Sequence, residues 1–198
     1  MSYTMKLVLA SPLSRVIREA QSLGQRLGMI SQFADLCQAI AYAHSRGVIH
    51  RDIKPANVLV GEFGETVVID WGVAKVKDRE DVHADGLAET IRMLNLGEDV
   101  DLAKTGYGHI VGTPVYMPPE QAAGDLEQVN ERSDVYGLGA VLYSILTGRA
   151  PYEGGSTADI LRKVRQEEPV PVPDLAPETP AELAAICKRA MARDPAKR

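Results

Sequence analysis

The segment His50-Arg51-Asp52-Ile53-Lys54-Pro55-Ala56-Asn57 is the sequence feature that most limits what this chain can fold into. Asp52, Lys54 and Asn57 place a carboxylate, an ammonium and an amide close together in one short stretch. A single stretch of this kind can arise by chance. The segment is informative only if the flanking sequence predicts helices or strands that would hold these three groups in place.

The flanks predict a helix before this segment and a β-hairpin after it. Apolar residues recur at helical intervals from Phe33 to His44, and Gly47 is placed to end the helix in the left-handed conformation. Two runs rich in β-branched residues, 58–60 and 67–69, enclose the turn sequence 61–64, which is typical of a hairpin. We expect this hairpin to return Asp70 to the neighbourhood of Asp52.

Three further motifs follow in a fixed order. They are Asp70-Trp71-Gly72, then Gly112-Thr113-Pro114-Val115-Tyr116-Met117-Pro118-Pro119-Glu120, then Ser133-Asp134-Val135-Tyr136-Gly137-Leu138-Gly139. With the 50–57 segment they resemble the catalytic loop, D-F-G triplet, end of the activation segment and central-helix start of bacterial eukaryotic-like serine/threonine protein kinases. Two positions depart from the family pattern: Trp71 replaces the usual Phe, and the usual A-P-E triplet is P-P-E here.

The resemblance implies a reaction and its catalytic groups. The reaction is transfer of the ATP γ-phosphoryl group to Ser or Thr hydroxyls of proteins. Asp52 would accept the proton of the attacking hydroxyl, and Lys54 would stabilise charge on the transferred phosphate. Asn57 and Asp70 would bind Mg²⁺, which prefers hard oxygen ligands completed by substrate phosphates.

The resemblance also implies nucleotide-binding and supporting residues. Adenine would meet the backbone at Lys6 and Val8, with Leu59 beneath the ring. His50 would stack on the aromatic Trp71 in a structural role. Asp134 would lie buried at the start of the central helix and hold backbone amides of the catalytic loop, and Arg198 would pair with Glu120.

Regulation is implied by Arg51, which in such kinases pairs with a phosphate on the activation segment. Thr105 is the candidate phosphosite, and an ordinary loop threonine is the alternative. Thr113 resembles the residue that helps to select a Ser/Thr acceptor. The implied partners are protein substrates and an activating kinase, unless the protein phosphorylates itself.

Composition is ordinary for one globular domain. The chain has 198 residues, 45% of them hydrophobic and 25% charged, and its net charge of −5 does not favour nucleic acid as a partner. Cys37 and Cys187 lie in helical patterns and are expected to be buried, reduced thiols. No apolar run reaches the roughly 18 residues of a membrane span, so we expect this part to be cytoplasmic, although kinases of this type often continue into a membrane anchor.

The expected fold is α+β and mainly helical: a protein kinase C-terminal lobe with a small catalytic hairpin, the N-lobe being largely absent. Residues 1–10 would form the hinge region, and 11–198 the C-lobe, truncated before its last helices. Neither the G-x-G-x-x-G loop nor the V-A-I-K lysine occurs in the sequence. We therefore expect the isolated chain to be inactive. The alternatives are a pseudokinase or binding module and, less favoured, a kinase-like small-molecule phosphotransferase.

Four local expectations complete the prediction. Ser11 and Pro12 would cap and begin a helix carrying Leu13, Val16 and Ile17. The acidic segment 75–108 is expected to be a mobile, solvated insertion, with a short docking helix as the alternative. Ser156 would cap another helix, and the proline-spaced run 169–173 would be extended. A last helix after Pro180 would face inward through Leu183, Ile186, Cys187 and Met191.

Overall fold

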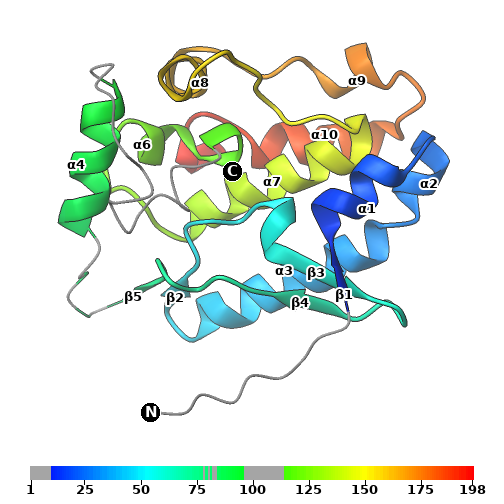
Figure 1. Ribbon diagram of the computed structural model, residues 1–198, viewed down its shortest axis with the longest axis horizontal. Helices are drawn as coiled ribbons and strands as arrows, with labels where there is room; N and C mark the ends of the chain where they lie inside the picture. Colours follow the sequence, from blue (N-terminus) through cyan, green and yellow to red (C-terminus); the bar gives the residue numbers. More distant parts are fainter. Residues whose placement is uncertain (1–9, 78, 80, 82–83, 96–113) are drawn as a thin grey trace.

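A computed structural model describes residues 10–77, 79, 81, 84–95 and 114–198 of the chain. Helices dominate the described part (Figure 1). Two small antiparallel sheets lie beside them, one of three strands in the order β1-β3-β4 and one made of β2 and β5. The predicted mainly helical α+β class is therefore confirmed.

The long helix α7 (Glu131–Thr147) is the centre of the molecule. Nearly all its residues from Ser133 to Leu146 are buried, as expected for a helix that is apolar on almost every side. Its N-terminus carries a capping box between Asn130 and Ser133, and Gly148 ends it with a φ of 72°. Gly137 and Gly139 have no side chain, which allows Ile53 and α10 to approach α7 closely.

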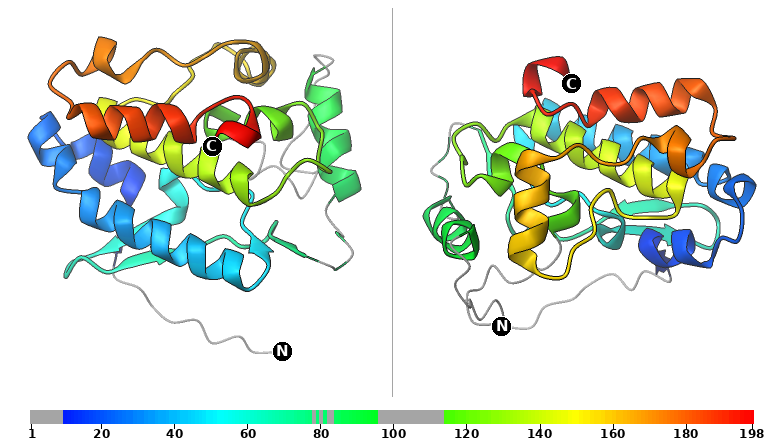
Figure 2. Two further views of the ribbon diagram at one scale, coloured as in Figure 1. Left: turned by 180° about the vertical axis from the view of Figure 1, so that it is seen from behind. Right: turned by 90° about the horizontal axis from the view of Figure 1, so that it is seen from above.

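Helices surround α7 on several sides (Figure 2). The first two are α1 (Leu13–Glu19) and α2 (Leu23–Leu27), and the predicted helix before the 50–57 segment is α3 (Ile30–Ser45). On the C-terminal side lie α6 (Pro119–Ala122), α8 (Thr157–Gln166), α9 (Val172–Leu175) and α10 (Ala181–Ala190). Single 3-10 turns occupy η1 (Pro55–Asn57), η2 (Pro114–Tyr116) and η3 (Pro195–Lys197).

The predicted hairpin is present as β3 (Val58–Gly61) and β4 (Thr66–Val68), joined through a turn in which Gly64 has a φ of 87°. Strand β1 (Ala10–Pro12) extends this sheet by pairing Pro12 with Leu59. The second sheet pairs β2 (Val48–Ile49) with β5 (Lys75–Val76). The two sheets hold the chain immediately before and immediately after the 50–57 segment.

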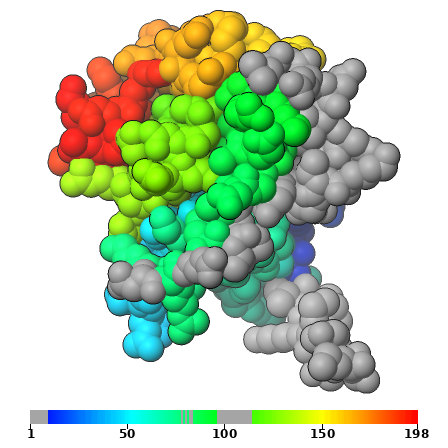
Figure 3. Space-filling view, turned by 90° about the vertical axis from the view of Figure 1, so that its left-hand side faces the viewer, coloured from blue at the N-terminus to red at the C-terminus, as the bar shows by residue number. Residues whose placement is uncertain are grey.

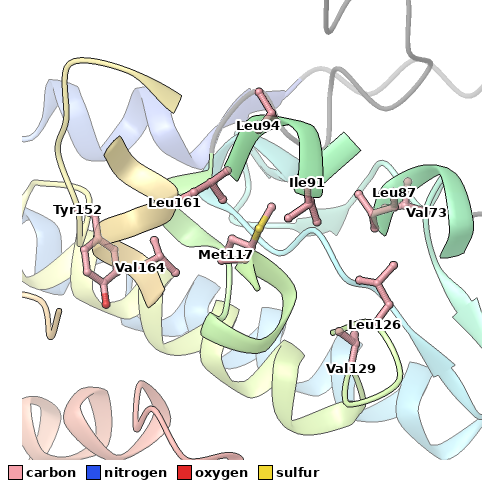
Figure 4. Close-up of a cluster of buried hydrophobic side chains, with 11 residues drawn as sticks. Val73, Leu87, Ile91, Leu94, Met117, Leu126, Val129, Tyr152, Leu161 and Val164 are labelled. Carbon is pink, nitrogen blue, oxygen red and sulfur yellow. The ribbon is translucent and has the colours of Figure 1, made fainter. Parts of the chain in front are cut away.

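The acidic segment contains the main departure from the sequence prediction. Residues Ala84–Asn95 form helix α4, whose Leu87 and Ile91 are fully buried. Their apolar face packs with Met117, Leu161 and Val164 in one of the hydrophobic clusters (Figure 4). The expected solvated insertion is therefore wrong for residues 84–95, which form the short helix given as the alternative. Their apolar side chains pack on an apolar surface of the helical lobe.

Smaller corrections concern helix ends and exposed side chains. Ser11 lies in β1, and Pro12 rather than Ser11 is the N-cap of α1. The run 169–173 is not extended throughout, since α9 begins at Val172. Ile186 is 54% exposed instead of facing inward, and Cys37 is only partly buried. By contrast, Ser156 caps α8 as predicted, and Cys187 is buried and free.

Candidate active site

The 50–57 segment crosses from β2 to β3 in an unusual backbone conformation. Arg51 has a φ of 69°, a left-handed value that costs a non-glycine residue roughly 1–3 kcal/mol. The carboxylate of Asp134 offsets this cost. Its two oxygens accept hydrogen bonds from the backbone N–H groups of His50, at 2.8 Å, and Arg51, at 2.9 Å.

Asp134 is 2% exposed and lies in the first turn of α7. The positive end of the helix dipole favours a carboxylate there. Nε2 of His44, near the end of α3, donates to the same carboxylate at 2.7 Å. Asp134 thus links α3, the 50–57 segment and α7, and its expected contact with backbone amides of the 50–57 segment is present.

Asp52 carries the most constrained polar cluster in the segment. Nζ of Lys54 donates to its Oδ2 at 2.7 Å, and Nδ2 of Asn57 donates to the same oxygen at 2.8 Å and to the Asp52 carbonyl at 2.9 Å. Among the described residues no hydrogen bond reaches Oδ1 of Asp52. Lys54 and Asn57 therefore hold one carboxylate oxygen of Asp52, and the other accepts no hydrogen bond from the described residues.

Burial affects the proton affinity of this carboxylate. Desolvation raises the pKa of Asp52, and the charge and hydrogen bond of Lys54 act in the opposite direction. The side chains of Lys54 and Asp52 are only 8% and 11% exposed. An acid with a raised pKa is a better proton acceptor than an ordinary surface aspartate.

The hairpin brings Asp70 to the same site. The N–H of Ile69 donates to the carbonyl of Asn57 at 2.9 Å, so Asp70 is one residue beyond a direct backbone link to Asn57. Asp70 is exposed and has a φ of 64°. Next to it, the rings of Trp71 and His50 are 4.5 Å apart between centroids and tilted by 55°.

His50 is fully buried, and its hydrogen bonds suit the neutral imidazole, in which one ring nitrogen donates and the other accepts. Its Nδ1 accepts from the N–H of Asp52 at 3.2 Å, and its Nε2–H donates to the carbonyl of Ile69 at 3.2 Å. Desolvation lowers the pKa of His50, against the opposing charges of Asp134, Asp52 and Asp70. These contacts fit a structural residue.

Asn57 and Asp70 fit a magnesium site in their chemistry. The NH₂ group of Asn57 donates to Asp52, so its amide oxygen is the atom that would bind a metal, and Asp70 has an exposed carboxylate. Within the described residues no cluster of three or more His, Cys, Asp or Glu side chains could hold a metal alone. Such a pair suits Mg²⁺ completed by water and phosphate oxygens.

A second polar cluster joins α6, the start of α7 and the residue after η3. Arg198 and Glu120 form a bidentate pair at 2.6 and 2.8 Å, and Ser133 Oγ donates to Glu120 at 2.7 Å. The Arg198 guanidinium also lies 5.0 Å from the centre of the Tyr136 ring. This pairing across the lobe was anticipated from the sequence.

The remaining candidates divide into two groups. Leu59 is partly buried in β3, paired with Pro12 on one side and Val67 on the other. Lys6, Val8, Thr105 and Thr113 lie outside the described residues. Sequence reasoning missed one partner altogether: Asp81, whose carboxylate contacts the guanidinium of Arg51. Nothing distinguished Asp81 from the other acids of its segment before the structure was known.

Comparison with known proteins agrees with the geometry. The sequence matches the protein kinase domain over residues 1–198. The chain belongs to the protein kinase family. It is 34% identical to the serine/threonine-protein kinase PknD of Protochlamydia amoebophila over 97% of the chain, and 38% identical to PknB of Mycolicibacterium smegmatis over 85% of the chain.

A third relative, PknD of Chlamydia pneumoniae, is 37% identical over 99% of the chain. The chain spans only 20% of the length of both PknD proteins and 24% of PknB. Among the helices that the structure describes, none is long and apolar enough to cross a membrane.

Proposed function

We propose that this kinase-family chain is the catalytic C-lobe of an ATP-dependent protein serine/threonine kinase. The observation that carries the proposal is the arrangement around Asp52, with one carboxylate oxygen held by Lys54 and Asn57 and the other unbonded among the described residues. Asp52 orients the acceptor hydroxyl and takes its proton. Lys54 places positive charge where the transferred phosphate gains negative charge.

Asn57 and Asp70 are the proposed magnesium ligands in this scheme. Bound Mg²⁺ would neutralise charge on the phosphates of ATP. The protein's contribution is to orient these two side chains through the Asn57–Asp52 and Ile69–Asn57 hydrogen bonds. Lys6, Val8 and Leu59 are the proposed adenine contacts, and Thr113 the residue that helps to select a Ser or Thr acceptor.

The experiment uses the full-length gene product that contains this chain. It is incubated with Mg-ATP and a generic protein substrate, and phosphate on Ser and Thr is measured by mass spectrometry. Asp52→Asn should lower turnover about 10²- to 10⁴-fold, because it removes the proton acceptor. Asp35→Asn, a surface aspartate on α3, is the matched control and should retain activity.

A pseudokinase or scaffold is the second candidate. The same full-length protein can be used to distinguish it from an active kinase. Binding of Mg-ATP without transfer, unaffected by Asp52→Asn, would favour that alternative. The retained Asp52, Asn57 and Asp70 argue against it, since each would be free to change in a degenerate site.

The isolated 198-residue chain is a separate case. It lacks the glycine-rich loop and strand lysine that position ATP phosphates in protein kinases, and positioning supplies most of this catalysis. We predict no measurable turnover by the purified chain alone. Transfer that the isolated chain performs and Asp52→Asn abolishes would contradict this prediction.

A further inference from the structure

The guanidinium of Arg51 is buried next to Asp52, the proposed catalytic aspartate. Its side chain is fully buried, and it pairs with the carboxylate of Asp81, which is 13% exposed. Its Nε and NH1 atoms are buried and make no hydrogen bond with the residues that the structure describes. A buried guanidinium needs a counter-charge, because removal of one partner leaves an uncompensated charge in the interior.

Asp81 is the carboxylate that meets this need. Asp134, a second acid near Arg51, accepts from the backbone N–H of Arg51 and not from its guanidinium. Among the described residues, the guanidinium of Arg51 forms a salt bridge with Asp81 alone. The charge of Arg51 is therefore balanced from within the segment that follows Asp70.

The chain holds Asp81 in this place from both sides. Before it, β5 pairs with β2, so that Lys75 lies opposite Ile49, two residues from Arg51. After it, the N–H of Ala84 at the start of α4 donates to the Asp81 carbonyl at 3.1 Å. Helix α4 is fixed in turn by its buried Leu87 and Ile91, and Figure 3 shows it lying against the helical lobe.

We infer that Asp81 is a positioning residue for phosphoryl transfer, supplying from the chain itself the anion that holds Arg51 and the adjacent Asp52. This inference rests on the proposed function. Arg51 has the left-handed φ of 69°, so the ion pair and the Asp134 hydrogen bonds together hold a backbone that would otherwise relax. With Asp81 in place, a phosphate on the activation segment is not needed to neutralise Arg51.

The kinetic test compares three variants of the full-length protein after phosphatase treatment. Asp81→Asn should lower kcat roughly 10- to 100-fold and leave the KM for ATP unchanged, because the carboxylate acts through Arg51 and not on the nucleotide. Asp81→Glu should recover most of the loss, since it restores the charge. Asp85→Asn, an exposed aspartate in the first turn of α4, is the matched control and should behave as wild type.

Phosphatase-treated wild type should retain its kcat. A wild type that loses its activity on dephosphorylation, or an Asp81→Asn variant as active as Asp85→Asn, would overturn the inference while leaving the proposed function intact. A wild type that transfers no phosphate before or after treatment would instead overturn the proposed function.

A thermal-unfolding cycle tests the pair without any activity measurement. Asp81→Asn and Arg51→Met should each lower Tm, and the double variant should lose less than the sum of the two single losses. Strictly additive losses would contradict the pairing. Should Asp81→Asn fail to fold, the double variant, which removes both charges, takes its place in the kinetic test: a reduced kcat supports the inference, and a wild-type kcat overturns it.

Discussion

His50 shows how a single buried side chain makes this fold sensitive to pH. Both ring nitrogens are used in the neutral form, with Nδ1 accepting from Asp52 and Nε2 donating to Ile69. Protonation would add a hydrogen to Nδ1 of His50, so that two N–H donors, this one and the backbone N–H of Asp52, would face each other. This mismatch adds to the desolvation that lowers the pKa of His50 in the folded state.

The sign of the pH effect follows from linkage. The folded pKa lies below the ordinary value of about 6.5, so the unfolded chain binds more protons as the pH falls through that value. The contribution of His50 to stability is present above the unfolded pKa and is lost as the pH falls through the folded one. Urea unfolding should therefore give a smaller free energy at about pH 5.5 than at about pH 7.5.

His50→Gln is the matching variant, because glutamine keeps polar groups and does not titrate. Its free energy of unfolding should change less across this pH range than that of the wild type. An equal pH dependence in both proteins would show that other groups cause the effect.

At the scale of the element, α4 is the part of the chain whose role the structure changed most. Its buried side chains Leu87, Ile91 and Leu94 pack on residues from α6 and α8 and from the segments between them. A helix held in this way contributes stability through buried apolar surface, whereas a solvated insertion contributes none.

Ile91→Ala should lower the free energy of unfolding by about 2–5 kcal/mol, the usual cost of truncating a fully buried large aliphatic side chain. Glu89→Ala, on the exposed face of the same helix, should change it by no more than about 0.5 kcal/mol. Chemical denaturation of the 198-residue chain measures both. Equal, small effects would show that α4 does not pack on the lobe in solution.

At the scale of the whole molecule, the Arg198–Glu120 pair joins parts of the chain that are far apart in sequence. Arg198 follows η3, Glu120 lies in α6, and Ser133 adds the start of α7 through its own bond to Glu120. The side chains of Arg198 and Glu120 are 0% and 5% exposed. A pair this deeply buried is costly to break on one side only.

Arg198→Met and Glu120→Gln should therefore each lower the free energy of unfolding by about 3–5 kcal/mol. The double variant should lose less than the sum of the single losses, by roughly 1–3 kcal/mol. Lys197→Met is the matched control, because this lysine is exposed. The free energies of unfolding are measured by urea denaturation. If Arg198→Met lowers this free energy no more than Lys197→Met does, the structural role of the pair is contradicted.

Local sequence was enough to predict most of the elements and the polar groups of the site. The helix before Gly47, the 58–68 hairpin and the central helix ending at Gly148 are each specified by nearby residues: apolar periodicity, β-branched runs and a glycine in the left-handed conformation. The proximity of Asp52, Lys54 and Asn57 was likewise predictable, because all three belong to one short segment.

Only the tertiary structure decided which distant groups meet. The ion pair between Asp81 and Arg51 depends on the β2–β5 pairing and on the packing of α4 against the lobe. Neither of these can be predicted from the residues around Asp81. The burial of α4 depends on an apolar surface assembled mainly from residues 117–164. By itself, then, the sequence determined the elements and the grouping of polar residues in the 50–57 segment, since their causes are local. The counter-charge of Arg51 and the place of α4 depend instead on long-range packing.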